Sequence, residues 1–320
     1  MQFIRGLNNL QPLRGGCVAT IGNYDGVHRG HQTVLAHLGQ HGDALGLPTV
    51  VVTFEPSPQE FFVPADSPPR LTRLREKLSL LRACGVDYVL CLRFNKRLAS
   101  MSPADFVHDL LVEGLGVRYL VVGDDFRFGQ GRRGDFHFLQ TCGLESGFAV
   151  EHMPTFAVEG ERVSSSRIRA ALAEGDLDMA ERLLGRPYSL CGRVIHGDKV
   201  GRTIGFPTAN ISLRRRASPL RGIYVVTING LEDGIAPGVA SIGTRPTVNG
   251  TRELLEVHLL GQNRDLYGQF LEVTFLKRLR DEERFSSVEA MRRQIEQDAH
   301  AARDHLGRLG FSTGALTGAN

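Results

Sequence analysis

The first half of the chain alternates apolar runs with segments of helical periodicity. The run TVVVTF at 49–54 has the near-continuous apolar character of a parallel strand that is buried on both faces. Similar runs predict strands at 17–22, 87–94 and 117–123. Helices are expected between them, from Thr72 to Cys84, after an N-cap at Ser102, and where Val34, Leu35 and Leu38 share one helical face. Strands separated by single helices predict a doubly wound, mostly parallel α/β sheet.

The pattern changes near residue 186. From there to about residue 276 the chain has short strand-like runs and Gly/Pro/Asn turns, which predict a small antiparallel β-barrel. A final helix is expected from a capping box at Ser286–Glu289, with Val288, Met291 and Ile295 as its apolar stripe. We therefore expect an α/β domain at 1–185, a β-barrel domain with a C-terminal helix at 186–308, and a frayed tail at 309–320.

Composition narrows the classes of partner. The 320 residues carry 38 basic and 35 acidic side chains, a net charge of +3 that suits anionic small molecules but does not make a nucleic-acid surface. The five cysteines are scattered singly, without a CxxC pair, which favours a reducing cytoplasm over a disulfide framework. The N-terminus lacks the apolar core of a signal peptide, and no run approaches the roughly 18 apolar residues of a membrane span. We expect a soluble cytoplasmic protein without membrane or nucleic-acid partners.

The stretch TIGNYDGVHRGH at 20–31 leaves the first predicted strand and enters the first helix, where open α/β sheets bind ligands. His31 falls in the first helical turn, whose free N–H groups favour an anion, and His28 precedes it by three residues. A zinc site would need a third ligand that is not nearby, and a surface turn with incidental histidines is the remaining alternative. Tight turns and close ligand approach are permitted by Gly22, Gly26 and Gly30.

Two other stretches carry candidate chemistry. VSSSRIR at 163–169 clusters hydroxyls and two arginines, which could clamp a triphosphate or form a solvated helix cap. The glycine-rich stretch at 192–210 could cradle phosphates through backbone N–H groups or form a hairpin, and its Thr208 and Asn210 offer oxygen ligands suited to Mg²⁺.

The run LLEVHLL at 254–260 presents a carboxylate on an otherwise apolar strand. Strand alternation places Glu256 and His258 on the face opposite Leu255, Val257 and Leu259. Such a glutamate could be a general base or a solvent-facing side chain.

These motifs together resemble the bacterial bifunctional riboflavin kinase/FAD synthetase family. GNYDGVHRGH resembles its HxGH-type opening motif, and TFEPSP at 53–58 its TFEPHP, with Ser57 where histidine is usual. VVGDDFRFGQGRRGD at 121–135 resembles its flavin-side loop, and GRVIHGDKVGRTIGFPTAN at 192–210 its riboflavin kinase motif. The chain departs from the family pattern at Gly261-Gln262, after the glutamate strand.

For the N-terminal domain the resemblance implies a nucleotidyltransferase that joins FMN and ATP into FAD and pyrophosphate. Its catalytic residues would be His28, His31 and Arg169. The ATP-binding residues would be Gly22, Asn23, Asp25, Gly30, Ser164, Ser165 and Arg167, and the flavin-binding residues Asp124, Asp125, Phe126 and Arg127.

For the barrel the resemblance implies a kinase that converts riboflavin and ATP into FMN, with Glu256 as base. ATP would lie against Gly192, Gly197, Gly201, Gly205, Pro207, Thr208 and Asn210, with Mg²⁺ at Thr208 and Asn210 and the flavin at Arg280, Glu283 and Phe285. Both steps would need Mg²⁺, and the partners would be riboflavin, FMN and ATP, bound by a monomer or weak homo-oligomer. The alternatives are an enzyme with one activity retained, and a non-catalytic flavin- or nucleotide-binding regulator that contacts RNA through RRRAS at 214–218.

Overall fold

The chain folds into two compact units. The computed structural model describes residues 1–9, 15–197, 201, 204–247, 250–262 and 264–311. Unit 1 comprises 1–68 and 72–165, and unit 2 comprises 69–71 and 166–320. Some residues lie outside those that the structure describes. They are 198–200 and 202–203 of the glycine-rich stretch at 192–210, which we call the glycine arch, and 312–320 of the predicted tail.

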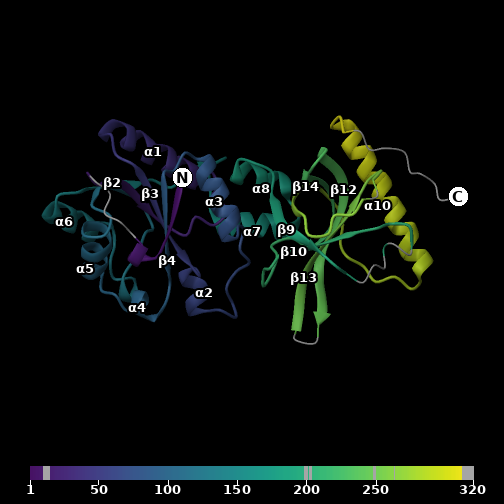
Figure 1. The fold of residues 1–320 in the computed structure, drawn as a ribbon, viewed down its shortest axis with the longest axis horizontal. Coiled ribbons are helices and arrows are strands. Elements are labelled where there is room, and N and C mark those ends of the chain that lie inside the picture. The colour runs from purple at the N-terminus through teal and green to yellow at the C-terminus, as the bar shows by residue number, and fades with distance from the viewer. Residues whose placement is uncertain (10–14, 198–200, 202–203, 248–249, 263, 312–320) are drawn as a thin grey trace. The chain divides into compact units, whose positions relative to one another are not determined.

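Unit 1 contains a six-stranded parallel sheet in the order β1-β4-β3-β2-β5-β6 (Figure 1). Its strands are β1 (Gln2–Arg5), β2 (Cys17–Ile21), β3 (Thr49–Glu55), β4 (Tyr88–Arg93), β5 (Val117–Gly123) and β6 (Ala149–Met153). Its helices are α1 (Arg29–Leu45), α2 (Pro58–Phe62), α3 (Leu74–Ala83), α4 (Lys96–Ala99), α5 (Pro103–Asp105), a π-helical segment (Phe106–Val112) and α6 (Phe136–Ser146). Two short strands, β7 (Ala157–Val158) and β8 (Glu161–Arg162), form a hairpin.

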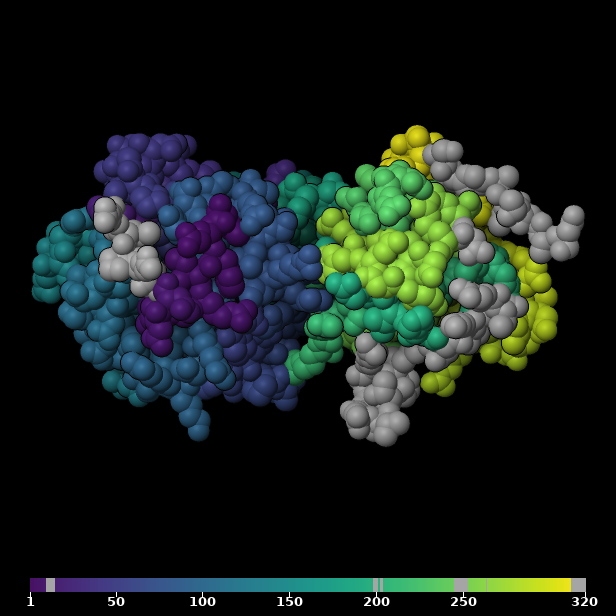
Figure 2. Space-filling view, in the orientation of Figure 1, coloured from purple at the N-terminus to yellow at the C-terminus, as the bar shows by residue number. Residues whose placement is uncertain are grey.

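Both faces of the sheet are buried, as the apolar strands predict. One face packs Val18 and Val51 against Leu38 of α1 and Leu81 of α3. The other packs the alternate strand residues against the π-helical segment and α6. The doubly wound α/β prediction is therefore confirmed. The edge strand β1 was not predicted; it lies at the surface of unit 1, as the purple N-terminal residues in Figure 2 show.

Unit 2 contains a closed antiparallel barrel in the order β10-β13-β12-β11-β14-β9. Its strands are β9 (Ser189–Ile195), β10 (Ala209–Ser212), β11 (Gly222–Leu231), β12 (Gly234–Thr247), β13 (Gly250–Leu259) and β14 (Phe270–Arg280). The helices of this part of the chain are α7 (Ser165–Glu174), α8 (Leu177–Leu184) and α10 (Val288–Arg308). The predicted barrel with a C-terminal helix is confirmed.

The start of α10 differs from its prediction by one residue. Ser287, and not Ser286, is the N-cap, and its hydroxyl accepts a hydrogen bond from the Ala290 amide at 3.1 Å. Val288 is 56% exposed, because the buried stripe of this helix is formed further along by Asp298, Ala299, Ala302 and Leu306.

The boundary between the units falls inside the segment that the sequence assigned to the first domain. Residues 166–185 cluster with unit 2, as do Pro69–Leu71. The Arg70 carbonyl accepts from Arg215 Nη1 at 2.8 Å, and the Leu71 carbonyl from the Tyr188 hydroxyl at 3.0 Å. Arg215 of the RRRAS run is thus partly buried and bound to backbone carbonyls. No helix in the described ranges is long and apolar enough to cross a bilayer.

Candidate functional sites

Unit 1 has a cavity of about 1020 Å³ at the carboxyl ends of its central strands. The sheet continues from β2 through β3 and β4 on one side, and through β5 and β6 on the other. The loops after β2 and β5 therefore border the crevice at which the strand order reverses, where open α/β sheets bind ligands. The cavity is lined by these predicted residues: Gly22, Asn23, Asp25, His28, Gly30, His31, Asp124, Asp125, Phe126, Arg127, Ser164 and Ser165.

The two histidines stack at the start of α1. Their ring centroids are 3.6 Å apart with an interplanar angle of 13°. His28 is the N-cap, and its Nδ1 accepts a hydrogen bond from the His31 amide at 3.3 Å. A neutral His28 ring therefore carries its proton on Nε2.

His31 is held in the neutral form. Burial lowers its pKa well below the usual value, and the nearby His28 and Lys77 lower it further. Its Nδ1 is buried without a hydrogen-bond partner. Lys77 is itself buried, with Nζ 3.5 Å from Thr53 Oγ1, and sequence reasoning had not singled it out.

Asp25 and Ser165 fix the loop between β2 and α1. The Asp25 carboxylate accepts from the Thr72 amide at 2.9 Å and from the Thr72 hydroxyl at 3.1 Å. The Ser165 hydroxyl donates to the Asp25 carbonyl at 2.9 Å. These contacts join three segments that are distant in the sequence, so both residues shape the cavity wall.

The predicted arginines of VSSSRIR belong to unit 2. Arg167 and Arg169 follow the boundary at Ser165, and Arg169 Nε donates to the Pro69 carbonyl at 2.7 Å. Their predicted contact with a triphosphate in the cavity of unit 1 stays a prediction.

Sequence analysis missed two residues that contact the loop at 121–135. The Thr155 hydroxyl donates to the Asp124 carboxylate and so lowers its pKa, and Arg162 pairs with Asp125. Thr155 lies two residues before the β7–β8 hairpin, and Arg162 is its last residue. Nothing in the sequence links this hairpin to Asp124 and Asp125. Phe126 stacks on Phe128 with centroids 5.5 Å apart.

Unit 2 has a second cavity, of about 230 Å³. It is lined by these predicted residues: Gly201, Thr208, Asn210, Glu256, Arg280, Glu283 and Phe285. Glu256 is brought there by strand pairing, because it lies opposite Asn210 of β10 and Ser241 of β12. Leu255, Val257 and Leu259 are buried on the other face of β13, which confirms the predicted alternation.

The glycines of the glycine arch differ in the atoms that a Cβ would meet and in their backbone conformation. A Cβ at Gly197 would lie 2.3 Å from Asn210 Nδ2, and a Cβ at Gly201 would lie 2.3 Å from the Phe206 carbonyl oxygen. Gly192 instead packs in the barrel wall, where a Cβ would lie 2.5 Å from Ile211. Gly205 has a φ of +87°, a conformation that favours glycine.

Arg280, which lines this cavity, is bonded to the helix α10. Arg280 forms a bidentate pair with Asp298, at 2.7 Å for Nη2–Oδ2 and 3.0 Å for Nε–Oδ1. Arg280 also lies 3.3 Å from Glu283, and its guanidinium is 5.7 Å from the Phe285 ring centroid.

His258 was placed on the correct strand face but not assigned to the site. It lines the cavity and bonds through Nδ1 to the Pro207 carbonyl at 2.9 Å. Pro207 is not among the described residues that line the cavity, and its predicted contact with ATP stays a prediction. Asp298 could not be found from the sequence, because nothing there distinguishes it from the other acidic residues of α10.

The departures from the family pattern have local structural roles. Ser57 is the N-cap of α2, where it forms a capping box with Glu60. Gly261 takes a φ of +72° in the turn after β13.

Comparison with known proteins gives concordant results for both units. The family model described as FAD synthetase matches residues 10–167, and the one described as riboflavin kinase matches residues 184–306. A bifunctional riboflavin kinase/FMN adenylyltransferase of Escherichia coli (strain K12) is 53% identical over 96% of this chain and 98% of its own length. The protein of that description from Pseudomonas fluorescens is 53% identical over 95% and 97%. A crystal structure described as a macrolide-efflux protein from Streptococcus pneumoniae has a TM-score of 0.81 at 29% identity, covering 95% of this chain and 99% of that one.

Proposed function

The chain belongs to the family of bifunctional riboflavin kinases/FMN adenylyltransferases, and we propose that each of its two cavities carries one of the two reactions. Riboflavin and ATP give FMN in unit 2, and FMN and ATP give FAD and pyrophosphate in unit 1. The observation that carries this division is that each cavity is lined by the motif residues of one activity and lies within one unit. The span 1–185 for the adenylyltransferase domain stays a prediction, because residues 166–185 cluster with unit 2.

In unit 1, an oxygen of the FMN phosphate attacks the α-phosphorus of ATP and pyrophosphate leaves. The attacking oxygen is already anionic, so catalysis rests on positioning and charge stabilisation and needs no strong base. A neutral His28 ring can donate to a phosphate oxygen only from Nε2, because its Nδ1 accepts a hydrogen bond from the His31 amide. The start of α1, with Gly30 and the stacked histidines, faces the reacting phosphates, and Ser164 and Ser165 hold the β- and γ-phosphates. A contact of Arg167 and Arg169 with these phosphates stays a prediction from the sequence. The loop of Asp124, Asp125, Phe126 and Arg127 lines the flavin side.

In unit 2, the 5′-hydroxyl of riboflavin attacks the γ-phosphorus of ATP, which gives FMN, and ADP leaves. An alcohol is a poor nucleophile, so a base must accept its proton. Glu256 is the carboxylate presented to the cavity by β13 and accepts this proton. The flavin lies towards Arg280, Glu283 and Phe285, and the nucleotide towards the glycine arch.

The donors beside the arch fit Mg²⁺. Thr208 and Asn210 line the cavity with hydroxyl and amide oxygens, the hard ligands that this ion prefers. Gly197 leaves the space beside the Asn210 amide that any Cβ would fill. When bound, Mg²⁺ would neutralise charge on the nucleotide phosphates. Thr208 and Asn210 would hold it on the nucleotide side of Glu256.

The proposal includes the cellular compartment of the enzyme and its binding partners. All five cysteines are free, which supports a reducing cytoplasm. The small-molecule substrates account for both cavities without nucleic acid or membrane, and we expect a monomer or weak homo-oligomer.

The test is Glu256→Gln, with flavins separated by chromatography after incubation with ATP and Mg²⁺. A general base contributes about 10²–10⁴-fold, so FMN formation from riboflavin should fall by that factor. Conversion of added FMN to FAD should stay within about twofold. The matched control is Glu272→Gln, a strand carboxylate of the same barrel that bonds to Ser189 at 2.7 Å. Equal loss of both activities in Glu256→Gln, or FMN without FAD from the unaltered protein, would contradict the division.

A further inference from the structure

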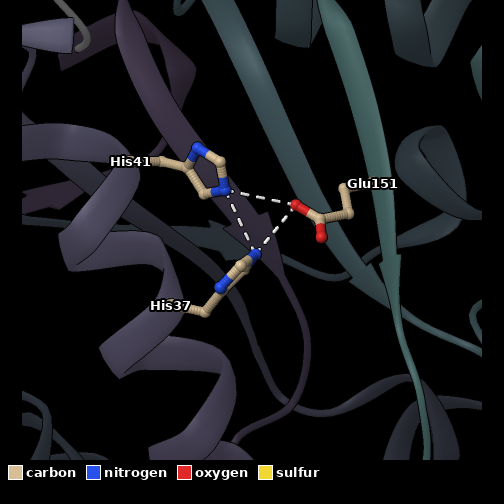
Figure 3. A group of neighbouring side chains, drawn as sticks. All are labelled: His37, His41 and Glu151. Atoms are coloured by element: carbon tan, nitrogen blue, oxygen red, sulfur yellow. Dashed lines mark hydrogen bonds and ion pairs between the residues drawn. The ribbon is translucent and has the colours of Figure 1, made fainter. Parts of the chain in front are cut away.

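Three potential metal ligands converge on the α1 side of the sheet in unit 1 (Figure 3). His37 and His41 are one turn apart on α1, and Glu151 comes from β6. His37 Nε2 lies 2.8 Å from Glu151 Oε2, His41 Nε2 lies 3.2 Å from that same oxygen, and the two Nε2 atoms are 3.1 Å apart. Among the residues that the structure describes, no other group of three His, Cys, Asp or Glu side chains converges in this way.

We propose that His37, His41 and Glu151 bind one divalent transition-metal ion of the Zn²⁺ class. Zinc binds histidine nitrogen and carboxylate oxygen at about 2.0–2.2 Å, so two corners of its tetrahedron lie about 3.3 Å apart. The three observed separations are within about 0.5 Å of that value, and a small outward shift of His37 and Glu151 admits the ion. The side chains are 27%, 28% and 35% exposed, so the solvent can supply the fourth ligand.

Tyr119 positions two of the three ligands. Its hydroxyl donates to Glu151 Oε2 at 2.6 Å, and its ring stacks on His41 with centroids 4.0 Å apart. Outer contacts of this kind orient metal ligands and raise affinity.

The ligand set is selective and separate from the nucleotide chemistry. Two imidazoles and one carboxylate suit Zn²⁺ and its neighbours, whereas Mg²⁺ prefers an all-oxygen octahedron. His37 lies six residues beyond His31, about 9 Å along the helix. None of the three ligands is among the described residues that line the cavity. The ion would therefore tie α1 to the edge strand β6 without contacting substrate.

The test is a metal titration of the chelator-stripped full-length protein in competition with a chromophoric chelator. The unaltered protein should bind Zn²⁺ at this site, and Co²⁺ should give the intense visible absorption of a tetrahedral complex. His37→Gln, His41→Gln and Glu151→Gln should each weaken binding by more than the 10–100-fold typical of an outer contact. Tyr119→Phe keeps the ring but removes the hydroxyl and should weaken it 10–100-fold.

The matched control is His108→Gln. His108 is an exposed histidine 3.0 Å from the Asp109 carboxylate, without a second histidine. This variant should bind Zn²⁺ as the unaltered protein does, and millimolar Mg²⁺ should not displace the ion. Equal affinity in His37→Gln and the unaltered protein, displacement by Mg²⁺, or an octahedral Co²⁺ spectrum would overturn the proposal. If a ligand variant fails to fold by circular dichroism, Tyr119→Phe decides, and unchanged affinity there counts against the site.

Discussion

Replacing Asp298 by asparagine removes the charge that holds Arg280 beside the cavity of unit 2. The Asp298 side chain is 7% exposed and that of Arg280 20%, and two guanidinium nitrogens lie 2.7–3.1 Å from the carboxylate. Breaking a buried pair of this kind costs about 3–5 kcal/mol, because the remaining charge loses its buried counter-charge, although the half-exposed Glu283 at 3.3 Å still partly compensates Arg280. Asparagine keeps one acceptor, so we expect the lower end, about 3 kcal/mol. At about 2–4 °C per kcal/mol for a unit of this size, the melting temperature should fall by about 6–12 °C.

Calorimetry of the full-length protein measures this shift in the transition of unit 2. Glu296→Gln is the control, because Glu296 contacts Arg292 at 3.1 Å on the same helix but the two side chains are 44% and 60% exposed. That exposed pair should contribute less than about 1 kcal/mol. Since Arg280 lines the cavity, Asp298→Asn should also raise the KM for riboflavin while conversion of FMN to FAD is unchanged. Equal calorimetric shifts in the two variants would refute the reasoning.

Two further predictions concern the nucleotide side of the same cavity. Burial lowers the pKa of His258 below 6.5, although its bond to the Pro207 carbonyl opposes this, so the unfolded chain binds a proton that the folded chain does not. The free energy of unfolding should therefore decrease as the pH falls from 7 to 5, and urea titrations of His258→Gln should show a smaller decrease; an identical decrease would contradict the assignment. Gly197→Ala should raise the KM for ATP in the kinase reaction only, because the new Cβ would displace the Asn210 amide. Gly307→Ala on α10 is the control, because its Cβ would meet open space, and its steady-state kinetics should be unchanged. Equal effects in both variants would contradict a nucleotide site beside Gly197 and Asn210.

The elements that the sequence predicted correctly are those in which one physical signal dominates. Continuous apolar character identified β3, and strict alternation identified the faces of β13. The Ser102 N-cap is present as predicted, since its hydroxyl accepts from the Asp105 amide at 3.1 Å. The helix that follows continues as a π-helical segment at 106–112, and no local pattern encodes that change of hydrogen bonding.

The parts of the sites that were missed depend on contacts between distant segments. Thr155 reaches Asp124 across 31 residues, and Asp298 reaches Arg280 across 18. Glu151 reaches His37 across 114 residues. Local motifs identify residues that a backbone loop itself presents, such as His28 and His31. They carry no information about partners that only the assembled sheet or barrel brings together.

The three residues Pro69–Leu71 affect how the two activities can be separated. Their carbonyls accept hydrogen bonds from Arg169, Arg215 and Tyr188, all in unit 2, yet they lie between two stretches of unit 1 in the sequence. A single cut after Ser165 would therefore leave the kinase fragment without these acceptors. A division of the gene at one point would separate three residues from the unit with which they cluster, so the native contacts of unit 2 draw on chain from both sides of unit 1's second stretch.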